Sequence, residues 1–445
     1  MYLNSSALLV DQYQLSMMEA YIQRDMNKTA VFELFVRRLP KERNFLVATG
    51  LEQALELLES LHFTPEELKW LKQTGKYSQD FLAYLADFKF RGDVDAMPEG
   101  TLFFPNEPIL QIIASMAEAQ FIESRIINLL HYQTLVASKA VRSVLMGPGK
   151  TLIDFGVRRS HGFEAGVLAA RASYIAGFTG TSTVLAERAF QIPAFGTMAH
   201  SFIEAHSDEN LAFQNFAEVH PENVIFLLDT YDTIKAAHKI CKLAPALVKQ
   251  GIKIKGVRLD SGDLAELSKQ VREILNSAGL EDTIIFVSGD LDEHKVHQLL
   301  ANGAPIDAFG VGTHLTTSTD APYLDMVYKL QAYDGIPKRK KSIGKATWPG
   351  KKQVFRTLSA DSTFASDVVA LESETIPGAT PLLQPVMRKG KRLHAPSSVA
   401  EIRKAVLKNL EQLPTSLKSL SIPSSPYPVE ISEGLKSLIQ KLDLN

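Results

Sequence analysis

The sequence predicts an α/β protein whose main body is an irregular TIM-like barrel of about seven parallel strands. From residue 151 onward, short apolar runs alternate with stretches of helical periodicity. Continuous apolar strands separated by helices are typical of a parallel sheet covered on both faces. About seven such units in a row favour a barrel or a long doubly wound sheet. The runs are TLIDFG (151–156), YIAGFTGTS (174–182), IPAFGT (192–197), VIFLLDT (224–230), IKGVRLDS (254–261), TIIFVSGD (283–290) and DAFGVGT (307–313).

The chain on either side of these runs has a different pattern, and its 445 residues leave room for three domains. Residues 1–115 mix helical and strand-like pieces and predict an N-terminal α+β domain. Residues 116–335 begin with a long helical stretch and hold the predicted barrel. Residues 336–445 form a C-terminal segment with terminal helices, which we expect to pack back onto the other domains. Its basic stretch, 338–352, is either a mobile loop that covers phosphates or a solvated face.

The composition argues against several classes of function. A formal net charge of −2 is not that of a protein whose main ligand is nucleic acid. No apolar run approaches the roughly 20 residues that span a bilayer, and the first residues lack the basic and apolar regions of a signal peptide. The single cysteine, Cys241, forbids an intrachain disulfide and fits a reducing compartment. We therefore expect a cytoplasmic protein that binds neither nucleic acid nor membranes.

Polar residues or glycines end each of the seven apolar runs. In a TIM-like barrel the carboxyl ends of the strands meet at one face, and that face carries the chemistry. Glycines in VSGD and FGVGT leave bare backbone N–H groups near a helix start, which suits a phosphate, and arginines suit phosphate or carboxylate. The sequence therefore predicts a site for a phosphorylated sugar and an anionic partner. The residues at these ends are Arg158, Ser182, His200, Asp229, Arg258, Asp260, Ser261, Gly289, Asp290, Gly310, Gly312 and Thr313.

Carboxylates and a histidine stand out among these ends. Asp260 and Asp290 suit sugar hydroxyls or a Mg²⁺ ion, whereas the role of a helix N-cap suits Asp263 and Asp292 better. Asp229 ends the run after His200, and a carboxylate that bonds one ring nitrogen frees the other nitrogen as a nucleophile or base.

The segment GPGKT (147–151) resembles the end of a nucleotide P-loop, but two features argue against that reading. Val144 stands where the first glycine of a P-loop belongs. The segment also precedes a predicted strand, whereas a P-loop follows one. We interpret it as a turn, so any ATP must bind in another way.

A series of motifs extends over most of the chain. They are VDQYQLSMMEAY (10–21), FELFVRRLP (32–40), DFGVRRSHG (154–162), FTGTSTVLA (178–186), GTMAHSF (196–202), GVRLDSGDL (256–264), VSGDLD (287–292), FGVGTHL (309–315) and GKATWPGKKQVFR (344–356). In this set and order the chain resembles the nicotinate phosphoribosyltransferases of the type II phosphoribosyltransferase group.

The resemblance implies an activity. The family joins nicotinate to phosphoribosyl pyrophosphate, giving nicotinate mononucleotide and pyrophosphate, in the salvage branch of NAD biosynthesis. It couples this reaction to ATP hydrolysis through a phosphorylated histidine, which matches His200, with Asp229 as the carboxylate that orients it. The expected cofactor is Mg²⁺, with ATP as a co-substrate. As pyrophosphate leaves, positive charge grows on the ribose C1 and negative charge grows on the pyrophosphate. Carboxylates near the ribose and arginine or Mg²⁺ near the pyrophosphate would stabilise these charges.

The resemblance also implies roles for the binding residues. Phe155 and Tyr13 match an aromatic pair around the pyridine ring, with the tyrosine reaching in from the other subunit of a homodimer. Arg158 matches a base-site residue, and Arg258 matches a contact on the pyrophosphate side. The phosphoribosyl set is completed by residues matching ribose contacts, 5′-phosphate loops and their neighbours: Asp260, Ser261, Gly289, Asp290, Gly310, Gly312 and Thr313. The metal ligands remain open, with Asp260 and Asp290 as candidates.

Three alternative functions compete with this interpretation. A nicotinamide phosphoribosyltransferase would carry aspartate in the motif GTDT, where this chain has GTST with Ser182, which is neutral and can donate to a carboxylate. An aldolase or isomerase barrel would usually show a Schiff-base lysine or a base carboxylate at a strand end, and none of the seven strand ends carries a lysine. A non-catalytic phosphate-binding barrel would be expected to have lost His200, Asp229, Arg258 or Asp290.

Overall fold

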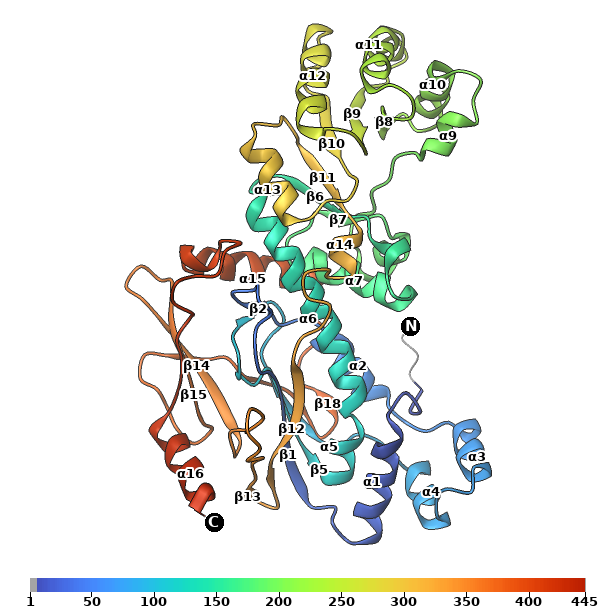
Figure 1. The fold of residues 1–445 in the computed structure, drawn as a ribbon. Coiled ribbons are helices and arrows are strands. Elements are labelled where there is room, and N and C mark those ends of the chain that lie inside the picture. The colour runs from blue at the N-terminus through green and yellow to red at the C-terminus, as the bar shows by residue number, and fades with distance from the viewer. Residues whose placement is uncertain (1–5, 445) are drawn as a thin grey trace. The chain divides into compact units, whose positions relative to one another are not determined.

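The computed structural model describes residues 6–444, which form two compact units (Figure 1). The parallel-sheet unit is Lys139–Asp320. The antiparallel-sheet unit joins the described chain before Lys139 to the chain from Ala321 onward. The three domains expected from the sequence divide the chain at other residues, and that division stays a prediction.

The parallel-sheet unit is built on six parallel strands in the order β7-β6-β11-β10-β9-β8 within the described chain (Figure 1). The strands are β6 (Thr151–Asp154), β7 (Gly180–Thr181), β8 (Val224–Leu227), β9 (Ile254–Leu259), β10 (Ile284–Val287) and β11 (Ala308–Val311). Six of the seven apolar runs thus form strands, which confirms the expected parallel α/β sheet. The seventh run, IPAFGT, makes only an isolated bridge between Thr181 and Ala194. A closed barrel of about seven strands is therefore not confirmed.

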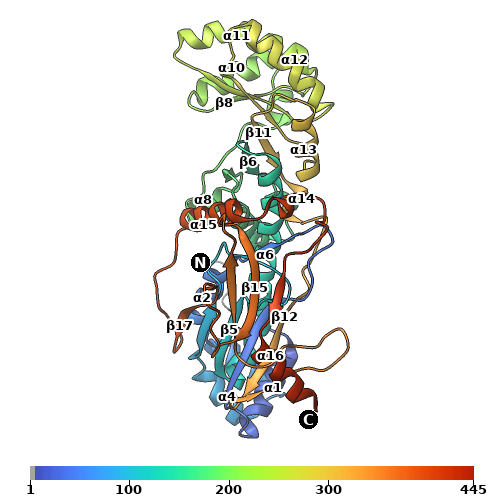
Figure 2. The same ribbon diagram turned by 90° about the vertical axis from the view of Figure 1, so that its left-hand side faces the viewer.

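Helices follow the strands of this unit in sequence. α11 packs between α10 and α12, and Figure 2 shows these three helices near β8. Asp232, Asp263 and Asp292 each accept a hydrogen bond from a backbone N–H in the first turn of a helix, so the N-cap role expected for Asp263 and Asp292 is confirmed. The elements are η1 (Val157–Arg159), α7 (Phe163–Ile175), α8 (Val184–Phe190), α9 (His200–Glu204), α10 (Glu209–Val219), α11 (Thr233–Lys249), α12 (Leu264–Ser277), α13 (Glu293–Ala301) and α14 (Thr313–Thr316).

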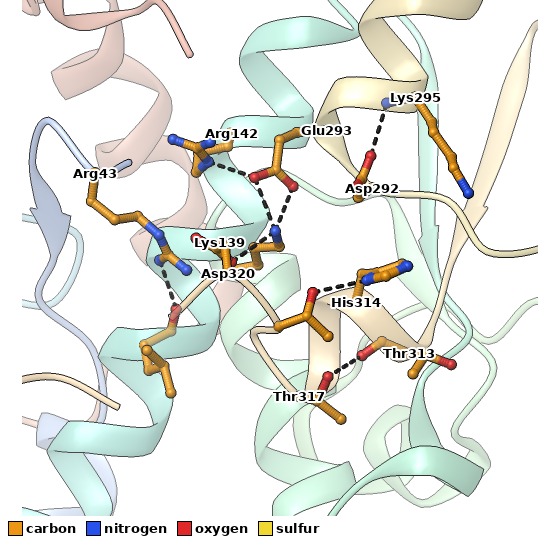
Figure 3. A network of polar contacts seen from close by, with 12 residues as sticks. Arg43, Lys139, Arg142, Asp292, Glu293, Lys295, Thr313, His314, Thr317 and Asp320 are labelled. Atoms are coloured by element: carbon orange, nitrogen blue, oxygen red, sulfur yellow. Dashed lines mark hydrogen bonds and ion pairs between the residues drawn. The ribbon is translucent and has the colours of Figure 1, made fainter. Parts of the chain in front are cut away.

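A buried network of charges holds the beginning of α13. Lys139 Nζ lies 2.7 Å from Glu293 Oε2 and 2.8 Å from Asp320 Oδ1, and Arg142 Nε lies 2.6 Å from Glu293 Oε1 (Figure 3). Glu293 is fully buried and Lys139 is 3% exposed. Burial alone would raise the pKa of the Glu293 carboxyl, but the charges of Lys139 and Arg142 outweigh burial and hold it below its usual value. The Glu293 carboxylate therefore stays ionised at neutral pH.

The antiparallel-sheet unit contains a seven-stranded antiparallel sheet, a four-stranded sheet and a two-stranded ladder among its described residues. In the seven-stranded sheet β1 pairs with β5 and, from nearly 300 residues later in the chain, with β12. The strands are β1 (Thr29–Val36), β2 (Leu46–Val47), β3 (Asp93–Ala96), β4 (Leu102–Phe103), β5 (Leu110–Ser115), β12 (Met326–Tyr333), β13 (Ile336–Pro337), β14 (Lys352–Leu358), β15 (Phe364–Leu371), β16 (Thr380–Pro381), β17 (Gln384–Arg388), β18 (Lys391–Arg392) and β19 (Val429–Ile431).

Helices complete this unit, and the longest of them, α6, runs on into the parallel-sheet unit. They are α1 (Gln12–Gln23), α2 (Leu51–Ser60), α3 (Pro65–Gln73), α4 (Gln79–Ala86), α5 (Met116–Phe121), α6 (Glu123–Met146), α15 (Val399–Gln412), η2 (Thr415–Leu417) and α16 (Glu433–Leu444). Of the helices within residues 6–444, none combines the length and apolar character of a membrane-crossing segment.

The basic stretch 338–352 begins after β13 and is mostly exposed as far as Ala346. Arg339 Nη1 lies 2.9 Å from Asp443 Oδ2 of α16. At its other end Lys352 is buried, with Nζ 2.7 Å from Glu33 Oε2. The stretch is therefore anchored at both ends, while its relation to phosphates stays a prediction.

Candidate active site

The carboxyl ends of the six parallel strands collect most of the predicted site residues. Each strand is followed at once by a polar or glycine-containing turn, as expected where strands feed the loops that carry function. The residues in or next to these turns are Phe155, Arg158, Ser182, Asp229, Arg258, Asp260, Ser261, Gly289, Asp290, Gly310, Gly312 and Thr313. Tyr13 lies in the other unit, on α1.

Arg258, near the end of β9, organises the centre of this group. Its guanidinium donates to Ser288 Oγ at 2.8 Å and to Asp260 Oδ1 at 2.7 Å, and it also reaches Thr197 Oγ1 at 3.3 Å. Ser288 donates a further hydrogen bond to the same Asp260 oxygen. Burial alone would raise the pKa of Asp260, but the Ser288 hydrogen bond and the Arg258 charge outweigh it and hold that pKa below its usual value. Asp260 is therefore ionised at neutral pH.

His200 is the first residue of α9, and its side chain is 40% exposed. Nδ1 lies 3.1 Å from Thr230 Oγ1, and Nε2 lies 3.9 Å from Asp260 Oδ2. Asp229 instead accepts a hydrogen bond from Ser261 Oγ at 2.5 Å, and its other oxygen is buried without a hydrogen-bond partner among the described residues. The ring of His200 thus has Thr230 and Asp260 as neighbours in place of the expected Asp229. An orienting role for Asp229 stays a prediction.

Phe155 follows β6 and lies against the glycines that end β11. Its ring makes an edge contact with Phe286, with centroids 5.4 Å apart, and the Arg258 guanidinium lies 5.5 Å from its centroid. A Cβ at Gly310 would stand 2.7 Å from the ring, and one at Gly312 would stand 2.9 Å from the Phe155 carbonyl oxygen. Both glycines are therefore required for the close packing of this loop. Their predicted contact with a 5′-phosphate is a separate matter that stays a prediction.

Asp154 joins the ends of β6 and β7 and was not among the predicted site residues. Its carboxylate accepts hydrogen bonds from Thr181 Oγ1 and from the Gly156 backbone, both at 2.8 Å. Its backbone oxygen accepts the N–H of Ser182 at 2.8 Å. Burial, partly opposed by the Thr181 and Gly156 hydrogen bonds, raises the pKa of Asp154 to about 6. Asp154 therefore fixes the turn that presents Ser182, whose side chain is half-buried.

The turn after β10 places Asp290 between two cationic or polar side chains. Its carboxylate accepts hydrogen bonds from Lys295 Nζ at 2.6 Å and from His314 Nε2 at 2.7 Å. Hydrogen bonds from Lys295 and then His314 hold the pKa of Asp290 below its usual value. Gly289 has φ +96°, and a Cβ there would stand 2.0 Å from the Asp260 carbonyl oxygen. Thr313 is the first residue of α14 and directly precedes His314, and it is exposed.

Tyr13 and Arg158 are the predicted base-site residues that the other clusters do not include. Arg158 is exposed on η1. Tyr13 is 47% exposed, and its hydroxyl donates to Glu123 Oε2 at 3.1 Å. Burial and the negative charge of Glu123 raise the pKa of Tyr13 to about 12, so it is a neutral phenol at physiological pH. Gln14 and Gln120 donate to the same carboxylate.

The residues present do not form a metal cage of their own. Within residues 6–444, no group of three or more histidine, cysteine or acidic side chains is arranged to hold a metal ion. The two candidate ligands already accept hydrogen bonds, Asp260 from Arg258 and Ser288, and Asp290 from Lys295 and His314. A Mg²⁺ ion in this site would therefore depend on ligands supplied by substrate phosphates.

Three polar residues of the site were missed in the sequence: Thr230, Lys295 and His314. Ser288 belongs to the strand end VSGD that the sequence predicted, although no contact was assigned to it. Thr230 and His314 each stand next to a residue that was selected, so their signal was a second polar residue in the same turn. Lys295 lies in the first turn of α13 and gave no signal beyond helix periodicity.

Comparisons with known proteins match one and the same family in three ranges along the chain. Residues 8–131, 151–365 and 378–439 match the models of the nicotinate phosphoribosyltransferase N-terminal domain, family and C-terminal domain. A nicotinate phosphoribosyltransferase of Mycobacterium tuberculosis is 45% identical over 438 residues, 98% of this chain and 94% of the relative. One of Bacillus subtilis is 38% identical, over 97% of this chain and 94% of its own length.

Solved structures give the same result. The human nicotinic acid phosphoribosyltransferase aligns with a TM-score of 0.88 and 28% identity, over 98% of this chain and all of that one. A nicotinate-nucleotide pyrophosphorylase from Pyrococcus furiosus aligns with a TM-score of 0.75 and 27% identity, over 92% of this chain and 96% of that one. The resemblance seen in the sequence motifs is confirmed, and the chain belongs to the nicotinate phosphoribosyltransferase family.

Proposed function

We propose that this protein is a nicotinate phosphoribosyltransferase that forms nicotinate mononucleotide and pyrophosphate from nicotinate and phosphoribosyl pyrophosphate, in NAD biosynthesis. The observation that carries the proposal is the Arg258–Asp260–Ser288 cluster at the strand ends, which pairs a cation with an ionised carboxylate in one half-buried site. Membership of the family supports the choice of substrates.

The reaction exchanges one bond at the ribose C1 for another. The pyridine nitrogen of nicotinate attacks C1 with its lone pair, and the bond from C1 to the pyrophosphate oxygen breaks with its electrons. Positive charge grows on the ribose and negative charge grows on the leaving group. The carboxylate of Asp260 stabilises the first and the guanidinium of Arg258 stabilises the second. The nitrogen carries no proton that must be removed, so Phe155 serves by stacking on the pyridine ring and positioning it.

His200 is proposed to couple this reaction to ATP hydrolysis as a phosphoryl carrier. Its ring is 40% exposed, and Thr230 contacts Nδ1. In the tautomer whose proton is on Nδ1, Nε2 has a free lone pair. Nε2 then attacks the terminal phosphorus of ATP, an N–P bond forms, and the bond to the departing ADP oxygen breaks. Water later cleaves the N–P bond and releases phosphate. The substitution His200→Ala tests this role: after incubation with ATP, mass spectrometry should find a phosphate on the wild type and none on the variant.

Ser182 is proposed to favour nicotinate over nicotinamide. The structure of the β7 turn supports this because Asp154 fixes the backbone at Ser182. A neutral hydroxyl donates to the nicotinate carboxylate, whereas an aspartate would repel it, and Arg158 would add positive charge. We expect Ser182→Asp to raise the KM for nicotinate by about tenfold or more, because one hydrogen bond is lost and a like charge is added. Unchanged nicotinate kinetics would remove Ser182 from the specificity site.

Two further parts of the proposal concern Mg²⁺ and a homodimer. Mg²⁺ would bind with the phosphates of phosphoribosyl pyrophosphate and neutralise the departing pyrophosphate. In a homodimer, Tyr13 of one subunit would complete the pyridine site of the other. Its half-exposed ring and neutral hydroxyl, held by Glu123, support a stacking role.

Product formation tests the proposal directly. The protein is incubated with phosphoribosyl pyrophosphate and Mg²⁺, with nicotinate or nicotinamide, each with and without ATP. We expect nicotinate mononucleotide, formed faster when ATP is present. Turnover of nicotinamide alone would overturn the assigned base, and turnover of neither base would overturn the enzymatic assignment. A rate that is indifferent to ATP would refute the coupling alone.

A further inference from the structure

We propose that His314 is a positioning residue, which holds the carboxylate of Asp290 in place for the ribose of phosphoribosyl pyrophosphate. His314 is the second residue of α14, directly after Thr313. Its Nε2 lies 2.7 Å from Asp290 Oδ1, and its Nδ1 lies 2.8 Å from Thr319 Oγ1. The role rests on the function proposed above, since it presumes that Asp290 meets the ribose.

The hydrogen-bond partners determine the proton on this ring. A carboxylate oxygen only accepts, so Nε2 must carry a hydrogen and donate it to Asp290. Thr319 can donate to Nδ1 when the ring is neutral, or accept from it when the ring is charged. The contact with Asp290 therefore persists in both protonation states of His314.

Asp290 needs support from outside its own turn. Its φ is +50°, the left-handed region that residues with a side chain seldom adopt. Lys295 Nζ bonds the Asp290 backbone oxygen at 2.6 Å and the carboxylate Oδ2 at 2.6 Å, but Lys295 belongs to the same turn and helix. His314 comes from α14, which follows β11 (Figure 3). It is therefore the contact that ties the Asp290 turn to the loop holding Gly312 and Thr313.

Both oxygens of Asp290 keep capacity for a ligand. Each carboxylate oxygen accepts about two hydrogen bonds, and the structure uses one on Oδ1 and one on Oδ2. The Asp290 side chain is 72% exposed, so its remaining lone pairs face solvent. A ribose hydroxyl can bond there while His314 and Lys295 stay in place. Loss of His314 would leave the Asp290 carboxylate free to rotate. Binding of the substrate would then carry the entropic cost of fixing that carboxylate, so the affinity would fall.

Two substitutions at His314 separate the two ring contacts. In His314→Gln, the amide nitrogen lies near the former Nε2 and can still donate to Asp290. In His314→Asn, the shorter amide lies near the former Nδ1 and reaches Thr319 alone. His297→Asn is the matched control, because His297 is an exposed histidine on α13. The KM and kcat for both substrates are measured, together with phosphoribosyl pyrophosphate binding by calorimetry with Mg²⁺ and thermal unfolding.

We expect His314→Asn to raise the KM and the Kd of phosphoribosyl pyrophosphate by about tenfold, the usual effect of one charge-assisted hydrogen bond. The KM for nicotinate and the unfolding temperature should match those of the wild type, and His314→Gln should recover most of the loss. Binding within twofold of the wild type in His314→Asn would overturn the proposal, as would equal losses in the Gln and Asn variants.

Calorimetry keeps this test separate from the proposed function. If the wild type binds phosphoribosyl pyrophosphate but turns over neither base, the enzymatic assignment fails, and the binding constants of the variants still decide the role of His314. If the wild type does not bind phosphoribosyl pyrophosphate at all, both proposals are overturned.

Discussion

Replacing Asp154 by asparagine should remove a loss of folding stability that the wild type shows as the pH rises. Asp154 is 1% exposed, and its pKa is raised from 3.8 to about 6. The folded state therefore binds more protons than the unfolded state between these values, so stability falls as pH rises from about 4 to about 6. A shift of about 2.2 pKa units corresponds to about 3 kcal/mol of lost stability above pH 6. Asparagine carries no charge, so the variant does not lose this stability as the pH rises.

The assay is urea unfolding followed by circular dichroism, at intervals between pH 4 and pH 7.5. At pH 4 the variant should be within about 1 kcal/mol of the wild type, because the neutral acid and the amide each keep one carbonyl oxygen for the Thr181 and Gly156 hydrogen bonds. By pH 7.5 the difference should have moved by about 3 kcal/mol in favour of the variant. Asp282→Asn, at an exposed carboxylate of the same unit, should change by less than about 0.5 kcal/mol over this range. A difference for Asp154→Asn that is constant with pH would refute the reasoning.

Other substitutions test the packing around the site. Glu293→Gln leaves two buried cations without their shared carboxylate and should lower the free energy of unfolding by about 3–5 kcal/mol, measured by urea unfolding at pH 7. The difference should shrink as the pH falls through the lowered pKa of the wild-type carboxyl, because that carboxyl then becomes neutral too, and a loss under 1 kcal/mol at pH 7 would contradict the network. Gly289→Ala places a Cβ 2.0 Å from the Asp260 carbonyl oxygen at a positive φ, and should weaken calorimetric binding of phosphoribosyl pyrophosphate. Gly303→Ala has positive φ and no atom within 4 Å, so it should cost about 1 kcal/mol of stability and leave binding intact.

The sheet of the parallel-sheet unit was largely predictable because its strands are buried on both faces and read as apolar runs. The exception was IPAFGT, where Pro193 has no backbone N–H to give to a ladder and leaves only the bridge at Ala194. The antiparallel-sheet unit was less predictable. β12 pairs with β1 from nearly 300 residues away, and no local periodicity contains the information for that pairing.

The position of each site residue along the chain was easier to predict than the direction of its side chain. Asp229 and Thr230 are neighbours after β8, in irregular chain where no strand or helix period fixes the direction of a side chain. The sequence identified the turn but could not decide which of the two would face His200, and Thr230 does so. Asp260 was selected for its charge, whereas its bonds to Arg258 and Ser288 depend on the register between β9 and β10.

The chain between β7 and β8 has few attachments to the sheet, and His200 lies within it. β7 contributes two residues, and the following segment contains α8, an isolated bridge at Ala194, and then α9 and α10. Segments with so few ladder hydrogen bonds open at lower free energy than the core, and their amide hydrogens exchange sooner with solvent. In the phosphoryl-carrier role proposed for His200, such freedom would let the same ring meet a nucleotide and then water without unfolding the sheet.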